Sequence, residues 1–166
     1  AHLGWIFVIG TQNESSLHAS LKEYYRQPGD RVEAHVDGYH IDVVQEGRLV
    51  EIQTTNFASI KKKLAQLLEN HNVHLVYPIV IRCDIVKVAP DTGELLSTRK
   101  SPKKEDIYDL FSELIRIPHL ILHPNLTIEA VFIKVREIRC DDGKGSWRRR
   151  GVSIVDRSLA EVVESR

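Results

Sequence analysis

The segment HIDVVQEGRLVEIQTTN, at residues 40–56, decides the fold of this chain. Two runs of alternating, largely β-branched residues, 39–44 and 49–52, stand on either side of the pair Glu46-Gly47. A glycine-containing pair between two such runs is typical of a strand, a tight turn and a returning strand. The segment therefore predicts an antiparallel hairpin that closes on this pair.

This hairpin would place two acidic side chains, Asp42 and Glu51, opposite each other. Strand alternation puts them on one face with His40, Val44, Leu49 and Gln53, and puts Ile41, Val43, Val50 and Ile52 on the other. Like charges opposed across a ladder repel, because their β-carbons lie roughly 4.5–5.5 Å apart. A divalent cation would offset that repulsion, and Mg²⁺ in particular prefers carboxylates and water. The alternative is a solvated polar face, in which both acids point into water at little cost.

The composition indicates one compact domain without an overall charge. The chain has 166 residues, long enough to bury an apolar core, and its 23 Lys and Arg balance its 23 Asp and Glu. Any basic surface for nucleic acid must therefore be local. Cys83 and Cys140 are too few for a disulfide framework or a zinc site, which predicts a reducing, cytoplasmic environment. The apolar run at residues 5–10 is too short to span a bilayer, so no membrane contact is expected.

The other elements follow from hydrophobic periodicity. The first half predicts a helix within residues 11–30, a strand at 31–38, the hairpin, a helix at 56–70 and an apolar strand at 73–81. The second half predicts a hairpin around residues 91–93, a helix at 103–117, two long strands at 126–140 and 146–155, and a short terminal helix at 157–165. The fold class is α/β (α+β), with a mixed sheet in the order helix, three strands, helix, strand. We expect residues 1–96 to form this core and residues 97–166 to pack on it as an extension within one domain.

This order of elements, with HIDVV on the second strand and LVEIQ on the third, resembles the PD-(D/E)XK nuclease superfamily over residues 11–81. The resemblance implies a restriction-endonuclease-like core with an added C-terminal hairpin and helices. It matches Asp42 to the aspartate of that family and Glu51 to the glutamate of its E-x-K motif. Gln53 stands at the lysine position, so the motif here is E-x-Q, a variant that occurs within the superfamily.

The resemblance implies a metal-dependent nuclease that hydrolyses DNA phosphodiester bonds, in DNA repair, restriction or mobile-element defence, with RNA left open as a substrate. Mg²⁺ or Mn²⁺ would be held by Asp42, Glu51 and the carbonyl of Ile52, would polarise the phosphate and would lower the pKa of a bound water. A second ion would bind through Glu14 on the first helix. Gln53 would position the attacking water, although its amide carries no positive charge.

The charge that Gln53 lacks is expected from the second helix. Lys61 borders the apolar stripe of that helix and is the candidate for a migrated lysine. Lys62 and Lys63 are candidates for contacts with phosphates. The alternative is that all three lysines form a solvated face.

Three further side chains are candidates for the same site. Glu14 falls within the apolar stripe of the first helix, which favours a metal, or it closes a capping box with Thr11. His18 lies one turn after Glu14, and His40 lies across from Gln53. Each of these histidines either lines the site or is an ordinary partly buried histidine.

Two basic clusters suit the phosphate backbone of DNA. They comprise Arg99, Lys100, Lys103 and Lys104 in the first, and Arg148, Arg149 and Arg150 in the second. The alternative for both is a solvated surface. Trp147, beside the second cluster, either stacks on a base or packs on its own sheet. The long hairpin from 126 to 155 is a candidate interface for a homodimer.

Three rival interpretations stay open. The first is a catalytically inactive nuclease-fold domain that binds DNA or a protein partner, with Gln53 marking the lost activity. The second is a nucleotide-binding domain in which FVIGTQNESS holds a phosphate, although this segment matches neither glycine-rich fingerprint. The third is an assembly module whose acids lie at the surface. For this module, relief of repulsion predicts that Asp42→Ala and Glu51→Ala are neutral or stabilising, and a nuclease without metal predicts the same.

Overall fold

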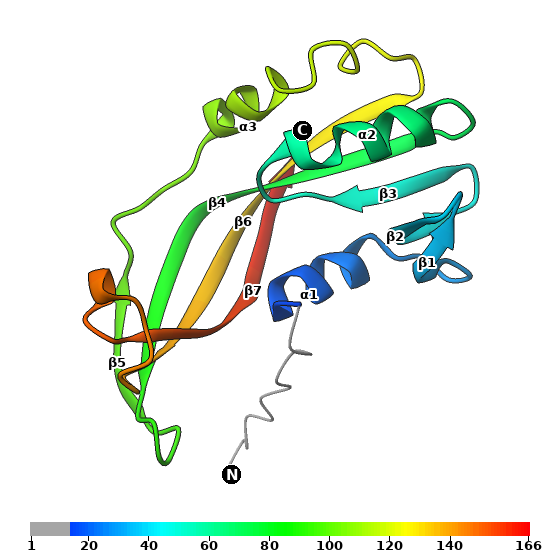
Figure 1. Cartoon of the computed structure of the whole chain (residues 1–166). Coiled ribbons are helices and arrows are strands. Elements are labelled where there is room, and N and C mark those ends of the chain that lie inside the picture. Colours follow the sequence, from blue (N-terminus) through cyan, green and yellow to red (C-terminus); the bar gives the residue numbers. More distant parts are fainter. Residues whose placement is uncertain (1–13) are drawn as a thin grey trace.

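The computed structural model describes residues 14–166, which form a mixed α/β fold built on one seven-stranded sheet (Figure 1). Its helices and strands are α1 (Ser16–Tyr25), β1 (Arg31–Val36), β2 (Tyr39–Gln45), β3 (Arg48–Ile52), α2 (Phe57–Leu68), β4 (Val73–Val88), β5 (Leu95–Lys100), α3 (Ile107–Leu114), β6 (Leu126–Cys140) and β7 (Ser153–Ser165). The strands run in the order β1-β2-β3-β4-β6-β7, and β5 pairs with β4 beside this path. The predicted order of helix, three strands, helix and strand is confirmed. Predictions that rest on residues 1–13, including the capping box with Thr11 and the phosphate-binding segment, lie outside the described residues.

The hairpin of β2 and β3 has the predicted register. Its pairs are Val43 with Val50, Val44 with Leu49 and Gln45 with Arg48. Gly47 in the turn has a φ of 84°, a left-handed conformation that glycine adopts without a Cβ clash. The short turn thus sets which residues of the two strands face each other.

Apolar side chains cover both faces of the sheet, and β4 runs between the two layers. Leu75, Tyr77 and Ile79 belong to a cluster with α2 and α3, whereas Val76 belongs to a cluster with α1 and β7. Because successive side chains of a strand point to opposite faces, β4 is buried on both sides. This position explains the near-continuous apolar run that predicted the strand.

The predicted alternation of faces along β2 is wrong at one point. Ile41 packs with the α2 cluster, whereas Val43 packs with the α1 cluster. Strict alternation would place these two side chains on one face. The change of face occurs beside Glu33 of β1, whose φ of 51° falls between two regular β1–β2 pairs. Asp42 lies at this irregularity, which brings it within reach of α1.

The C-terminal strand corrects the predicted terminal helix. Residues 157–165 belong to β7, which pairs antiparallel with β6 along most of its length. The spacing of Leu159 and Val162 suits a helix, but the open edge of β6 requires a partner for its backbone groups. The strand expected at 146–155 also starts later, because Trp147–Arg149 form a 3-10 turn.

The other expected elements of the second half are confirmed. β4 and β5 form the hairpin predicted around residues 91–93, and α3 ends at Leu114, before Pro118. The division expected at residues 96 and 97 falls inside β5, a strand of the same sheet. Among the described residues, no helix is long and apolar enough to cross a membrane.

Candidate active site

Two carboxylates, Asp42 on β2 and Glu51 on β3, are buried where the hairpin ladder ends. Their exposed fractions are 8% and 7%. The Asp42 N–H donates to Glu51 Oε1 at 3.0 Å, and the Ile52 N–H donates to Asp42 Oδ2 at 2.8 Å. Each acid therefore accepts a hydrogen bond from a backbone amide of the facing strand. Hydrogen bonds of this kind are how a protein tolerates buried carboxylates.

A lysine of α2 neutralises one of these carboxylates. Lys63 Nζ donates to Glu51 Oε2 at 2.7 Å and to the backbone carbonyl of His40 at 2.6 Å. Lys61 was expected to supply this charge, but its side chain is exposed, and so is that of Lys62. The structure therefore assigns the position beside the pair to Lys63 and not to Lys61. Lys61 and Lys63 border the apolar stripe of α2 on opposite edges, because they lie two residues apart at ~100° per residue. The edge that carries Lys63 is the one that reaches β3.

A histidine of α1 contacts the other carboxylate. His18 Nε2 lies 3.3 Å from Asp42 Oδ2, and His18 Nδ1 lies 3.1 Å from Glu14 Oε1. Within the described residues the buried Nε2 has no partner at hydrogen-bond geometry, so its contact with Asp42 is electrostatic. Glu14 also pairs with Lys22, a buried lysine that pairs with Glu33 as well. A chain of alternating charges thus runs from β1 through α1 to Asp42.

Glu14 lies directly before the N-cap of α1. Ser15 is the N-cap and accepts a hydrogen bond from the His18 N–H at 3.3 Å. Glu14 therefore precedes the helix and does not stand at the position from which a capping box is closed. Its carboxylate is used instead in the ion pairs with His18 and Lys22.

The two carboxyl groups differ in their tendency to ionise. Burial raises the pKa of Asp42, but His18 and the Ile52 N–H outweigh burial, so the pKa of Asp42 is lowered overall. Burial and the nearby charge of Asp42 raise the pKa of Glu51, and Lys63 offsets only part of this rise. The contact with Asp42 raises the pKa of His18, against the opposite effect of burial. Neighbouring carboxyls whose pKa values are pushed apart are typical of acid–base sites.

Two predicted site residues point elsewhere. Gln53 Nε2 donates to the carbonyl of Thr55 at 2.7 Å, so its amide holds the loop before α2. The His40 ring is exposed and packs edge-on against His35, with 5.5 Å between ring centroids. This arrangement brings neither the Gln53 amide nor the His40 ring to the carboxylates, and only the backbone of His40 reaches the site, through Lys63.

A divalent cation at this pair would have few protein donors and would have to keep most of its water. Within residues 14–166, no three His, Cys, Asp and Glu side chains gather as a metal cluster. Mg²⁺ is commonly bound through few carboxylates and several waters. Asp42 uses only Oδ2 in its contacts within this part of the chain, and Glu51 becomes available if Lys63 releases it. Glu14, the predicted ligand of a second ion, pairs with His18 and with Lys22 through Oε1.

The structure groups the basic residues differently from the two clusters that the sequence predicted. One groove of about 290 Å³ is lined by basic side chains from several segments, Lys87, Arg99, Arg139 and Arg148–Arg150. No sequence pattern indicated Lys87 and Arg139, which become neighbours through the parallel pairing of β4 with β6. Lys103 lies at a second, smaller cavity, and Lys100 and Lys104 are exposed.

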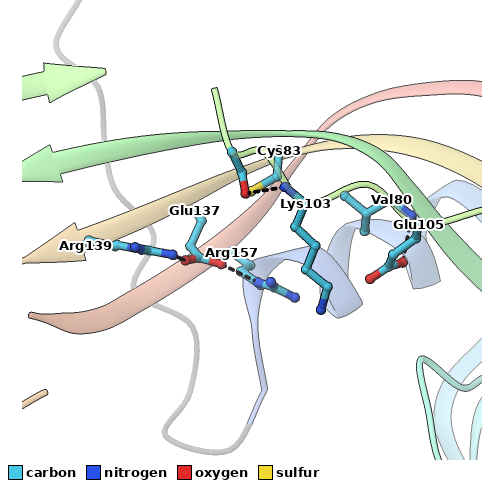
Figure 2. A pocket seen from close by; sticks show the side chains of 8 residues that line it. Val80, Cys83, Lys103, Glu105, Glu137, Arg139 and Arg157 are labelled. Atoms are coloured by element: carbon cyan, nitrogen blue, oxygen red, sulfur yellow. Dashed lines mark hydrogen bonds and ion pairs between the residues drawn. The ribbon is translucent and has the colours of Figure 1, made fainter. Parts of the chain in front are cut away.

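The smaller cavity surrounds a buried acid (Figure 2). Glu137, which is 2% exposed, pairs with Arg139 at 2.6 Å and with Arg157 at 2.9 Å. Burial raises the pKa of Glu137, but the two arginines outweigh burial and lower it overall. Burial also raises the pKa of the nearby Cys83 thiol, which makes this cysteine a poor nucleophile.

Similarity to known proteins extends over nearly the whole chain. A family described as "Domain of unknown function (DUF8091)" matches residues 15–166. An uncharacterized protein of Treponema pallidum (strain Nichols) is 36% identical over 158 residues, which cover 95% of this chain and 62% of that protein. This chain therefore spans less than two thirds of the length of that relative. No solved structure matches the chain.

Proposed function

We infer that this chain, which belongs to the DUF8091 family, is a metal-dependent phosphodiesterase that hydrolyses DNA. The observation that carries this proposal is the buried pair of Asp42 and Glu51. Two helices supply this pair with nitrogen partners, His18 from α1 and Lys63 from α2. Buried carboxyls with perturbed pKa values and specific charge partners are more frequent at functional sites than elsewhere.

The order of the elements also supports a restriction-endonuclease-like core. The chain runs α1-β1-β2-β3-α2-β4, with β3 and β4 parallel and the two acids on β2 and β3. The strand order β1-β2-β3-β4 places the acids near the middle of this part of the sheet, between the helices on its two faces. In the superfamily that the sequence resembles, the acids that hold the metal lie on the corresponding hairpin.

The side chains of the site have separate tasks in this reaction. Asp42 and Glu51 would hold Mg²⁺ or Mn²⁺, which supplies Lewis-acid activation of water and of the scissile phosphate when bound. Lys63, whose side chain is 20% exposed, presents its ammonium beside the pair and is placed to contact a phosphate oxygen. His18 lies beside Asp42 and lowers the pKa of its carboxyl group, which favours the ionised form that binds a cation.

A second candidate is a nuclease-fold domain that binds DNA or a protein partner without cutting. The ion pairs favour this candidate, since Lys63 and His18 satisfy both carboxylates from within the chain. Gln53 favours it as well, because its amide turns toward Thr55. The two candidates differ in whether DNA is cleaved and in whether cleavage requires Asp42.

Incubation of labelled DNA with the purified chain, in Mg²⁺, Mn²⁺ or EDTA, tests the proposal. We expect cleavage with either ion by the wild type and by Glu46→Gln, a control in the exposed turn of the same hairpin. Asp42→Asn keeps the shape of the side chain and is expected to abolish cleavage, with circular dichroism verifying its fold. Cleavage by Asp42→Asn at the wild-type rate contradicts the proposal, and absence of cleavage by the wild type favours the inactive domain.

A further inference from the structure

A basic groove lies at the end of the sheet that is remote from β1 (Figure 1). β5 and the turn at Trp147–Arg149 form its walls, together with β4 and β6. We propose that this groove, with the adjacent Trp147, binds an unpaired strand of DNA. This assignment rests on the proposed function, because it names the form of the DNA that reaches the carboxylate pair.

The charges of the groove point to a polyanion. Lys87 pairs with Asp141 at 3.0 Å, and Arg139 pairs with Glu137 at 2.6 Å. The other basic side chains of the groove, Arg99, Arg148, Arg149 and Arg150, have no carboxylate within 4.0 Å among residues 14–166. Guanidinium groups without a carboxylate partner around one hollow repel each other, and phosphates relieve that repulsion through bidentate hydrogen bonds.

The turn that carries three of these arginines is held in one shape. The Gly145 N–H donates to the Gly151 carbonyl at 2.9 Å, and the Arg150 N–H donates to the Trp147 carbonyl at 3.0 Å. A Cβ added at Gly145 would lie 1.8 Å from the carbonyl oxygen of Val152, so this position requires glycine. A turn closed this tightly presents its side chains with little loss of freedom on binding.

The exposed ring of Trp147 favours an unpaired strand over a duplex as the ligand of the groove. Its side chain is 83% exposed, and the guanidinium carbon of Arg148 lies 5.6 Å from the centre of its ring. An exposed aromatic ring beside arginines is the arrangement on which the bases of single strands stack. The bases of a duplex stack on each other instead, so they leave such a ring without a partner.

The groove adjoins the smaller cavity through one shared residue, Arg139. Arg139 lines both the groove and the smaller cavity, where Lys103 and Arg157 also lie (Figure 2). Arg157 follows Asp156 on β7, and Asp156 accepts a hydrogen bond from the Ser16 N–H of α1 at 3.0 Å. α1 then carries His18 to the pair. These contacts link the groove, through β7, to the helix that carries His18.

Fluorescence anisotropy in EDTA tests the assignment without cleavage, with a labelled single-stranded DNA and a duplex of the same length as probes. We expect the wild type to bind the single strand more tightly than the duplex. Trp147→Ala should weaken binding of the single strand about tenfold and leave duplex binding nearly unchanged, as expected for loss of one stacked base. Trp147→Phe should restore most of the affinity, because it keeps a ring. Arg148→Ala should lower the slope of log affinity against log salt by about 0.7.

The controls separate this proposal from the proposed function. Arg26→Ala, which removes an exposed arginine on another face, should change neither affinity nor salt slope. Tighter binding of the duplex, tighter binding of an RNA strand of the same sequence, or unchanged binding by Trp147→Ala overturns the groove assignment. Asp42→Asn should keep wild-type binding while it loses cleavage. If Asp42→Asn still cleaves but the groove variants lose binding, the proposed site of cleavage fails and the groove stands.

Discussion

Lys63 on α2 donates a 2.7 Å hydrogen bond to the buried carboxylate of Glu51 on β3. This contact joins the helix to the hairpin and provides a counter-charge for the carboxylate from within the chain. A divalent cation that binds Glu51 has to compete with this ammonium. If the proposed metal site exists, the stability of the hairpin and its affinity for metal are therefore linked through Lys63.

Replacement of Lys63 by alanine is expected to lower the free energy of unfolding by about 1–3 kcal/mol, because a buried carboxylate loses its cation. Lys61→Ala is the matched control, since Lys61 is an exposed lysine of the same helix. Its effect should stay within about 0.5 kcal/mol. Urea unfolding of both variants measures the difference, and equal effects would show that the ion pair with Glu51 contributes nothing.

Asp42→Ala is expected to destabilise the chain by about 1–3 kcal/mol without metal, because it leaves the buried Ile52 N–H without an acceptor. This expectation replaces the neutral or stabilising effect that repulsion alone predicted from the sequence. Asp42→Asn keeps an acceptor oxygen and should be affected less. Chemical unfolding in EDTA tests the order wild type, Asp42→Asn, Asp42→Ala, and a gain of stability in Asp42→Ala would contradict it.

Stability is expected to depend on pH through His18 and Asp42. The pKa of His18 is raised above 6.5 in the folded chain. The stability that protonated His18 contributes to the fold is therefore complete below pH 6.5 and is lost as the pH rises through the folded pKa. The pKa of Asp42 is lowered below 3.8, so its contribution is complete above pH 3.8 and is lost as the pH falls through the folded pKa. His18→Gln should remove the loss on the alkaline side. Thermal midpoints measured from acidic to alkaline pH test both effects. If the midpoint of His18→Gln falls toward alkaline pH as much as that of the wild type, the role given to His18 is contradicted.

Gly145→Ala is expected to disrupt the turn of the groove, because its Cβ would overlap the carbonyl of Val152. Binding of single-stranded DNA should fall, while any effect of metal on unfolding should persist, since the carboxylate pair is on other strands. Gly38→Ala is a control for the backbone strain of substituting a glycine, as Gly38 has a φ of 80° and open space around it. Anisotropy and thermal unfolding of both variants give the comparison. Wild-type binding by Gly145→Ala would show that the shape of the turn is not required.

The hairpin and the helices could be predicted because local signals decide them. The Glu46-Gly47 turn sets the register of β2 and β3, and the apolar stripe from Phe57 to Leu68 sets the buried face of α2. The strand at 157–165 could not be predicted in the same way, because the spacing of its apolar residues also suits a helix. Its conformation is decided by the unpaired edge of β6, a strand distant in sequence.

The acids of the candidate site were found in the sequence, but their partners were not. A helical wheel places Lys61 and Lys63 at opposite edges of one stripe, and only the packing of α2 on the sheet selects Lys63. The side-chain amide of Gln53 donates to the carbonyl of Thr55 in the loop, and no hydrophobic periodicity predicts this contact. Register and burial are thus readable from local patterns, whereas charge pairing requires the tertiary arrangement.

Thermal unfolding with increasing Mn²⁺ tests whether Asp42 and Glu51 share a divalent cation, as we propose. The wild type and Glu46→Gln are predicted to gain stability with the ion, by about 2.7 kcal/mol at about 100 times the dissociation constant. Asp42→Asn is predicted to gain no stability from the ion. Lys63→Ala is predicted to gain stability at lower concentrations of the ion, because no lysine competes for the Glu51 carboxylate. A midpoint that ignores Mn²⁺ in the wild type, or rises equally in Asp42→Asn, would contradict a metal site at this pair.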